Sequence, residues 1–116
     1  MEIITKPWGY EQIWAHSDKY VGKILVINSG KKLSRQYHVK KDETIYVLNG
    51  TLTLEIGEGN SLESMDLNKG DTYHVEPKTI HRFCNSTEEE LRLIEVSTTE
   101  LDDVVRLEDD YGRSYA

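Results

Sequence analysis

Several residue types that define protein classes are scarce in this chain. Its 116 residues include one cysteine and two prolines. Cys84 alone can form neither an intrachain disulfide nor a cysteine-based zinc module, which favours a reducing compartment. No apolar run approaches the roughly 20 residues that a membrane-spanning helix needs. Residues 1–10 also lack the apolar segment of a signal peptide, so we expect a cytoplasmic protein without a membrane partner.

Basic charge is scarce as well, and its distribution along the chain is uneven. The chain has 21 acidic and 14 basic residues, which gives a formal net charge of −7. Residues 1–85 hold 11 of each sign, whereas residues 86–116 hold 10 acidic and 3 basic residues. Dedicated nucleic-acid-binding proteins usually carry a strong basic excess, so we expect no nucleic-acid partner.

Short strand signals dominate the rest of the sequence. They are runs of β-branched and other apolar residues at 23–28, 44–48, 51–56, 72–75, 81–85 and 91–96. Asn49-Gly50, between two such runs, is the strongest short-range hairpin signal. Because strands and turns alternate over short intervals, the pattern predicts one all-β domain, a sandwich or barrel. We expect a loop over residues 57–68 and a short helical turn within residues 100–108.

Four side chains form a candidate metal site. Gln36 and His38 are two positions apart, so in a strand they point to the same face. Glu43 joins them if its strand turns the same face inward, and a jelly roll would bring His81 alongside. Two imidazoles, a carboxylate and an amide oxygen suit zinc, iron, manganese, nickel or cobalt. We therefore predict a site for one divalent metal ion.

The spacing around these residues resembles the first cupin motif, G-x5-H-x-H-x3,4-E-x6-G. Here Gly30, Gln36, His38, Glu43 and Gly50 occupy its named positions. The single departure is Gln36, which stands where the motif has its first histidine.

A second run resembles the second cupin motif, G-x5-P-x-G-x2-H-x3-N. Gly70, His81 and Asn85 have its spacing, although Pro77 is displaced by one position and Lys78 replaces the inner glycine. The resemblance implies a small double-stranded β-helix, the cupin jelly roll. It also implies the metal ligands Gln36, His38, Glu43 and His81.

A narrower resemblance extends over nearly the full chain. It rests on the segments 6–9, 33–38, 81–82, 94–96 and 106–113. These segments resemble the type II mannose-6-phosphate isomerase cupin, the C-terminal module of bifunctional mannose-1-phosphate guanylyltransferase/isomerases. Glutamine in place of the first motif histidine is normal in that family. Residues 1–116 contain no nucleotidyltransferase segment, so we do not expect guanylyl transfer from them.

The resemblance implies an enzyme that interconverts mannose 6-phosphate and fructose 6-phosphate. Its cofactor would be one divalent metal ion, with zinc as the first choice and manganese, iron, nickel or cobalt as alternatives. Its partners would be a sugar phosphate and a second copy of the chain in a homodimer. Two other functions stay open, because a fold does not determine a function. One is a different metal-dependent cupin enzyme, such as a dioxygenase. The other is a cupin that binds sugar without turnover.

Four further residues are candidates for catalysis or substrate binding. Glu95 shares a strand face with apolar neighbours, so it is either buried near the site or exposed. Arg113 belongs to a C-terminal tail, residues 98–116, which we expect to pack near the site; it either contacts substrate or serves structure. Lys32 and Ser34 lie at even positions like Gln36 and His38, so in a strand they point to the same face. They are candidates for orienting a sugar phosphate. A basic run beside the ligands forms either a solvated rim or an electropositive lip: Lys31, Lys32, Arg35, Lys40 and Lys41.

Overall fold

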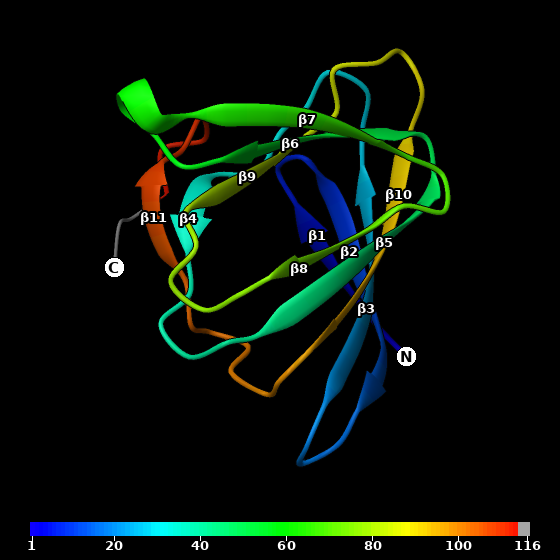
Figure 1. The fold of residues 1–116 in the computed structure, drawn as a ribbon. Coiled ribbons are helices and arrows are strands. Elements are labelled where there is room, and N and C mark those ends of the chain that lie inside the picture. Colours follow the sequence, from blue (N-terminus) through cyan, green and yellow to red (C-terminus); the bar gives the residue numbers. More distant parts are fainter. Residues whose placement is uncertain (114–116) are drawn as a thin grey trace.

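Two antiparallel sheets face each other in the computed structural model, which describes residues 1–113 (Figure 1). The first sheet contains, in spatial order, β1 (Glu2–Lys6), β2 (Gly9–His16), β3 (Val21–Ile27), β10 (Leu91–Ser97), β5 (Glu43–Asn49) and β8 (Thr72–Val75). The second contains β11 (Val105–Glu108), β4 (Arg35–Tyr37), β9 (His81–Cys84), β6 (Thr51–Ile56) and β7 (Glu63–Asn68). The predicted all-β fold is confirmed. In residues 1–113 no helix has the length and apolar character needed to cross a membrane.

The core lies between the sheets and follows from alternation along the strands. Ile45 and Val47 of β5 and Leu52 and Leu54 of β6 are fully buried, while the residues between them are more exposed. Burial of one such side chain stabilises the fold by about 1.5–3 kcal/mol. The predicted hairpin is present, and its Gly50 has a φ of 90°, a left-handed conformation that glycine adopts readily.

Two local predictions were wrong. Half of the expected loop over residues 57–68 is the strand β7, which pairs with β6 along its whole length. Met65 and Leu67 are half-buried and alternate with exposed polar residues, a weak period-two signal for an edge strand. The expected helical turn over 100–108 is instead a short turn followed by β11, because pairing with β4 stabilises the extended chain.

The N-terminal hairpin of β1 and β2 was absent from the predicted strands. It lies beside β3 through register pairs that run from Gly9 with Ile27 to His16 with Val21. Gly9 is required at this point, since a Cβ atom there would lie 1.9 Å from the carbonyl oxygen of Val26. The close approach buries the neighbouring Trp8 against the core.

The tail after β10 crosses back to the second sheet, where its strand β11 pairs with β4 (Figure 1). Two buried arginines hold it there. Arg35 lies 2.8 Å from Glu55 and 3.0 Å from Glu108, and Arg82 lies 3.4 Å from Glu108 and 3.0 Å from Asp110. We call these five residues the tail clasp. The tail prediction also covers residues 114–116, which lie outside the described residues.

Candidate metal centre

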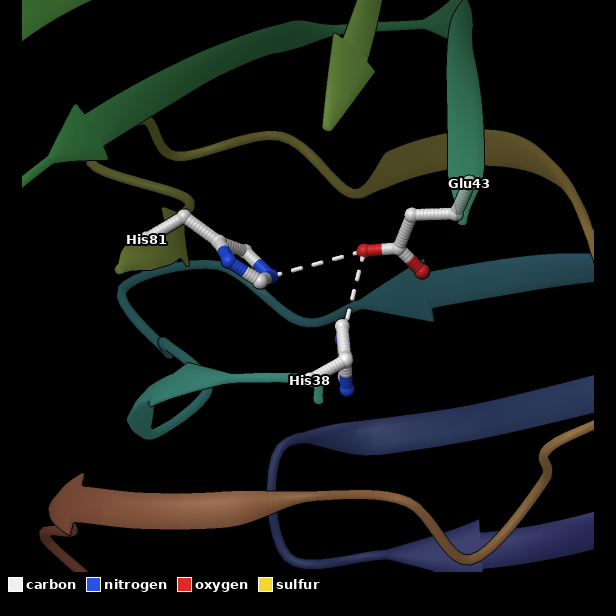
Figure 2. Close-up of side chains that lie close together, drawn as sticks. All are labelled: His38, Glu43 and His81. Carbon is white, nitrogen blue, oxygen red and sulfur yellow. Dashed lines mark ion pairs between the residues drawn. The ribbon is translucent and has the colours of Figure 1, made fainter. Parts of the chain in front are cut away.

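Three side chains from separate parts of the chain converge between the sheets (Figure 2). Glu43 begins β5, His81 begins β9, and His38 follows β4. The Nε2 atoms of both histidines lie 3.4 Å from Oε1 of Glu43. One ligand atom from each residue fits within 4.8 Å of the others, and all three side chains are buried. The structure thus brings together three of the four predicted ligands.

The hydrogen bonds of the imidazoles prepare both Nε2 atoms to bind a cation. Nδ1 of His38 lies 2.6 Å from the carbonyl oxygen of Asp103, and Nδ1 of His81 lies 2.8 Å from that of Thr79. A carbonyl oxygen only accepts hydrogen bonds, so each Nδ1 carries a proton. In a neutral imidazole the lone pair then resides on Nε2.

Within the described residues, these lone pairs have no hydrogen-bond donor. Among residues 1–113, neither Nε2 atom takes part in a hydrogen bond, because the Glu43 Oε1 atom that lies 3.4 Å from each is itself an acceptor. A buried polar atom without a partner costs about 1–3 kcal/mol. Histidines that bind metals typically donate the other ring N–H to a carbonyl or carboxylate, as both do here. The buried set of two lone pairs and a carboxylate oxygen therefore fits a divalent metal ion.

Gln36 lies next to this cluster. It is the register partner of His81 across β4 and β9, so the two side chains share a face of the sheet. Ser34 Oγ donates a hydrogen bond to Gln36 Oε1 over 2.6 Å. An amide oxygen has a second lone pair, which stays available for a ligand. Ligation by Gln36 stays a prediction. The hydrogen bond from the buried Ser34 holds the side-chain amide of Gln36 in place.

A buried lysine links Glu43 to a second carboxylate. Lys41 Nζ lies 3.1 Å from Glu43 Oε2 and 3.1 Å from Glu95 Oε2. Burial alone would raise the pKa of Glu43, but the positive charge of Lys41 opposes burial and helps to hold that pKa well below its usual range. Burial raises the pKa of Glu95 to about 7; the negative charge of Glu43 adds to the rise and Lys41 opposes it. Glu43 is therefore the carboxylate that stays ionised.

The sequence left Lys41 either on a solvated rim or on an electropositive lip, and the structure instead buries it between two carboxylates. Its side chain is only 7% exposed. Burial disfavours the ammonium form, but the charges of Glu95 and Glu43 outweigh burial and raise the pKa of Lys41 well above its usual range. Arg35 is also buried rather than on a rim, since it belongs to the tail clasp. The run of basic residues was visible in the sequence, but which of them face inward was not.

A cavity opens beside the cluster and includes Gln36, His38, Glu43 and Glu95 in its lining. The sequence left Glu95 either buried or exposed, and the structure buries it here. The N-terminal hairpin and the tail supply further walls: Lys6, Trp8 and Glu11 from the hairpin, and Leu101, Val104, Arg106 and Arg113 from the tail. Sequence reasoning missed the hairpin, because its contribution depends on strand pairing with β3.

Two other predicted residues have contacts of a different kind. Lys32 Nζ lies 3.6 Å from Asp110 Oδ2 and is not part of the cavity lining. Arg113 does line the cavity, and Asp109 binds its guanidinium through hydrogen bonds of 2.9 and 2.8 Å. Those hydrogen bonds lower the pKa of Asp109 to about 2. Substrate contact by Lys32 and Arg113 stays a prediction.

Solved structures with this architecture define the fold class. KdgF from Halomonas sp. has a TM-score of 0.75 with 21% identity, over 88% of this chain and 91% of that one. CapF from Staphylococcus aureus has a TM-score of 0.82 with 15% identity, over 92% of this chain and 32% of that one. The fold is the double-stranded β-helix of cupins, as the motifs predicted.

The family follows from a comparison of sequences. The family model described as "Mannose-6-phosphate isomerase C-terminal" matches residues 2–109, and the chain belongs to this family. It is 34% identical over 114 residues to the mannose-1-phosphate guanylyltransferase of Escherichia coli K12, and 30% identical over 112 residues to that of Salmonella muenchen. These alignments cover 95% and 94% of this chain. The chain spans 23% of the length of either relative.

Proposed function

We propose that this domain is a metal-dependent isomerase that interconverts mannose 6-phosphate and fructose 6-phosphate. The observation that carries the proposal is the pair of buried, unpartnered Nε2 lone pairs facing Glu43. The family description supports the substrate class. Zinc is our first choice of ion, since it favours histidine nitrogen and carboxylate oxygen.

The ligands in this proposal are Gln36, His38, Glu43 and His81. A divalent ion bound there supplies positive charge that polarises a carbonyl oxygen of the sugar. The protein's part begins with Ser34, which holds the amide of Gln36, and with the carbonyl groups that orient both imidazoles.

Aldose–ketose isomerisation also needs a group that moves a proton between C1 and C2 of the sugar. We assign this role to Glu95, the buried carboxylate of the cavity that is not a proposed ligand. Lys41 contacts Glu95 and Glu43 together, so it sets the distance between the base and the ligand. Arg113 and Trp8, from opposite ends of the chain, help to enclose the substrate.

The test is to load the protein with zinc, measure its metal content, and follow mannose 6-phosphate and fructose 6-phosphate by NMR. We expect interconversion in both directions by the wild type. His38→Ala should lose both the bound metal and the activity, whereas His16→Ala, an exposed histidine, should retain both.

Three results would count against the proposal. Unchanged metal content in His38→Ala would remove the ligand assignment. Tight binding of sugar phosphate without interconversion by the zinc-loaded protein would favour a binding domain. Oxygen uptake by the iron-loaded protein would favour a dioxygenase.

A further inference from the structure

The arginines of residues 1–113 differ in how their charges are neutralised. Arg35 and Arg82 form the tail clasp, Arg92 lies 2.8 Å from Glu90, and Arg113 lies 2.8 Å from Asp109. Arg106 forms no ion pair within the described part of the chain, and its Nε is buried without a hydrogen-bond partner there. Within residues 1–113, the other four arginines thus have carboxylate partners and Arg106 has none.

Arg106 lines the same cavity as the metal cluster. Its register partner across β11 and β4 is Gln36, and the register partner of Gln36 across β4 and β9 is His81. Side chains of directly paired residues share a face, so Arg106, Gln36 and His81 form a row across the second sheet. The guanidinium, which forms no ion pair within residues 1–113, therefore lies at one end of a row whose other two members are proposed metal ligands.

The charges around Arg106 favour the binding of an anion. Burial lowers the pKa of Arg106, and the nearby charge of Arg113 lowers it further. An arginine nevertheless stays protonated at neutral pH, so the positive charge persists and is poorly solvated. Lys6, another cation of the cavity lining, also forms no ion pair within residues 1–113.

We propose that Arg106 binds the phosphate group of the substrate, a phosphate monoester, while the metal centre holds the reacting end of the sugar. This inference rests on the proposed function. A planar guanidinium matches phosphate through two parallel hydrogen bonds, and such charge-assisted pairs are about twice as strong as neutral ones. Arg106 is one strand spacing from Gln36, roughly 5 Å between backbones, and two strand spacings from His81, roughly 10 Å between backbones. A ligand that spans this distance has its charged group remote from its reacting carbons, as a hexose 6-phosphate does.

The experiment compares Arg106→Gln with Arg92→Gln, which removes an arginine of the outer surface whose side chain is 42% exposed. The ligand is mannitol 1-phosphate, the reduced form of mannose 6-phosphate, which has no carbonyl group and cannot isomerise. Calorimetry on the zinc-loaded proteins gives its Kd. We expect Arg106→Gln to weaken binding by about 10- to 100-fold, since one charge-assisted pair is lost. Arg92→Gln should bind like the wild type, and Arg106→Lys should be intermediate.

Metal content and inorganic phosphate serve as further readouts. Arg106→Gln should keep the zinc content of the wild type and should bind inorganic phosphate more weakly. An unchanged Kd for mannitol 1-phosphate in Arg106→Gln would overturn the inference, as would an equal loss of affinity for neutral mannitol. If the wild type isomerises sugars and Arg106→Gln has the same KM, the inference fails while the proposed function stands. If the wild type binds the phosphate ester through Arg106 but does not isomerise, the proposed function fails and the anion site stands.

Discussion

The metal cluster and the tail clasp are both groups of buried polar side chains, but they differ in how fully their polar atoms are paired. In the tail clasp, Arg82 donates hydrogen bonds to the Leu33 carbonyl and to Asp110, and Arg35 donates to Glu55 and Glu108. In the metal cluster, the Nε2 atoms of His38 and His81 are buried and have no hydrogen-bond partner within residues 1–113. The clasp is complete as a structural unit, whereas the cluster has free acceptor atoms within residues 1–113 that the proposed metal ion would occupy.

The exposure of the carboxylates differs in the same way. Glu108 and Asp110 of the tail clasp have side chains that are 58% and 46% exposed, whereas those of Glu43 and Glu95 are at most 5% exposed. Loss of a cation from the clasp leaves carboxylates in water. Loss of the Lys41 cation leaves Glu43 and Glu95 buried, and an unpaired buried charge is far more costly. Four predictions test this difference.

The largest effect is expected for Lys41→Met. The change leaves the buried Glu43 and Glu95 side by side without their cation, so the free energy of unfolding of the metal-free protein should fall by about 3–5 kcal/mol. Urea denaturation measures this. Addition of zinc should restore part of the loss, because the ion binds only the folded protein. Lys40→Met, at an exposed neighbour, should be neutral; equal destabilisation of the two variants would contradict the comparison.

Arg82→Met should have a smaller effect. It removes a hydrogen bond to the Leu33 carbonyl and the contacts with Glu108 and Asp110, but the two carboxylates stay solvated. We expect a loss of about 2 kcal/mol in the free energy of unfolding. Zinc should stabilise this variant as much as it stabilises the wild type. A restoration specific to Arg82→Met would show that the clasp and the metal cluster are coupled.

Asp103→Ala tests how the tail orients His38. The Asp103 carboxylate accepts hydrogen bonds from the backbone N–H groups of Val39, Lys40 and Lys41, and its carbonyl accepts one from His38. Because the carboxylate is partly exposed, we expect a loss of only about 1 kcal/mol in stability. Zinc affinity, measured by competition with a chelator, should fall more than it does in the exposed control Asp102→Ala. Equal zinc affinity in both variants would remove the orienting role.

The smallest effect is a pH dependence of the tail. Hydrogen bonds from Arg35 lower the pKa of Glu108, and those from Arg113 lower the pKa of Asp109 to about 2. A carboxylate whose pKa is lower in the folded state than in the unfolded state stabilises the tail at pH values above the unfolded-state pKa. That stabilisation is lost as the pH falls through the folded-state pKa. Amide hydrogen exchange of β11 should therefore accelerate between about pH 4 and pH 2. Exchange that accelerates already at pH 6 would contradict this assignment.

Much of the fold was readable from local patterns. The alternation in β6 and the Asn49-Gly50 turn predicted a hairpin that the structure contains. The weaker alternation of β7 was overlooked because Met65 and Leu67 are its only strongly apolar residues. The N-terminal hairpin was not predicted, because nothing local marks Gly9 as a required glycine. Its requirement comes from the carbonyl group of Val26 on a neighbouring strand, which leaves no room for a Cβ atom at Gly9.

The sequence by itself determined the class of the protein, because the spacings from Gly30 to Gly50 and from Gly70 to Asn85 are properties of the chain alone. The tertiary structure decided which charges are neutralised. Lys41 and Lys32 look alike in the sequence, yet one is buried between two carboxylates and the other lies beside Asp110 in solvent. Arg106 and Arg113 are seven residues apart, yet only Arg113 has a carboxylate partner within the described residues. Burial and pairing depend on neighbours that are distant in the chain, and only the folded arrangement brings them together.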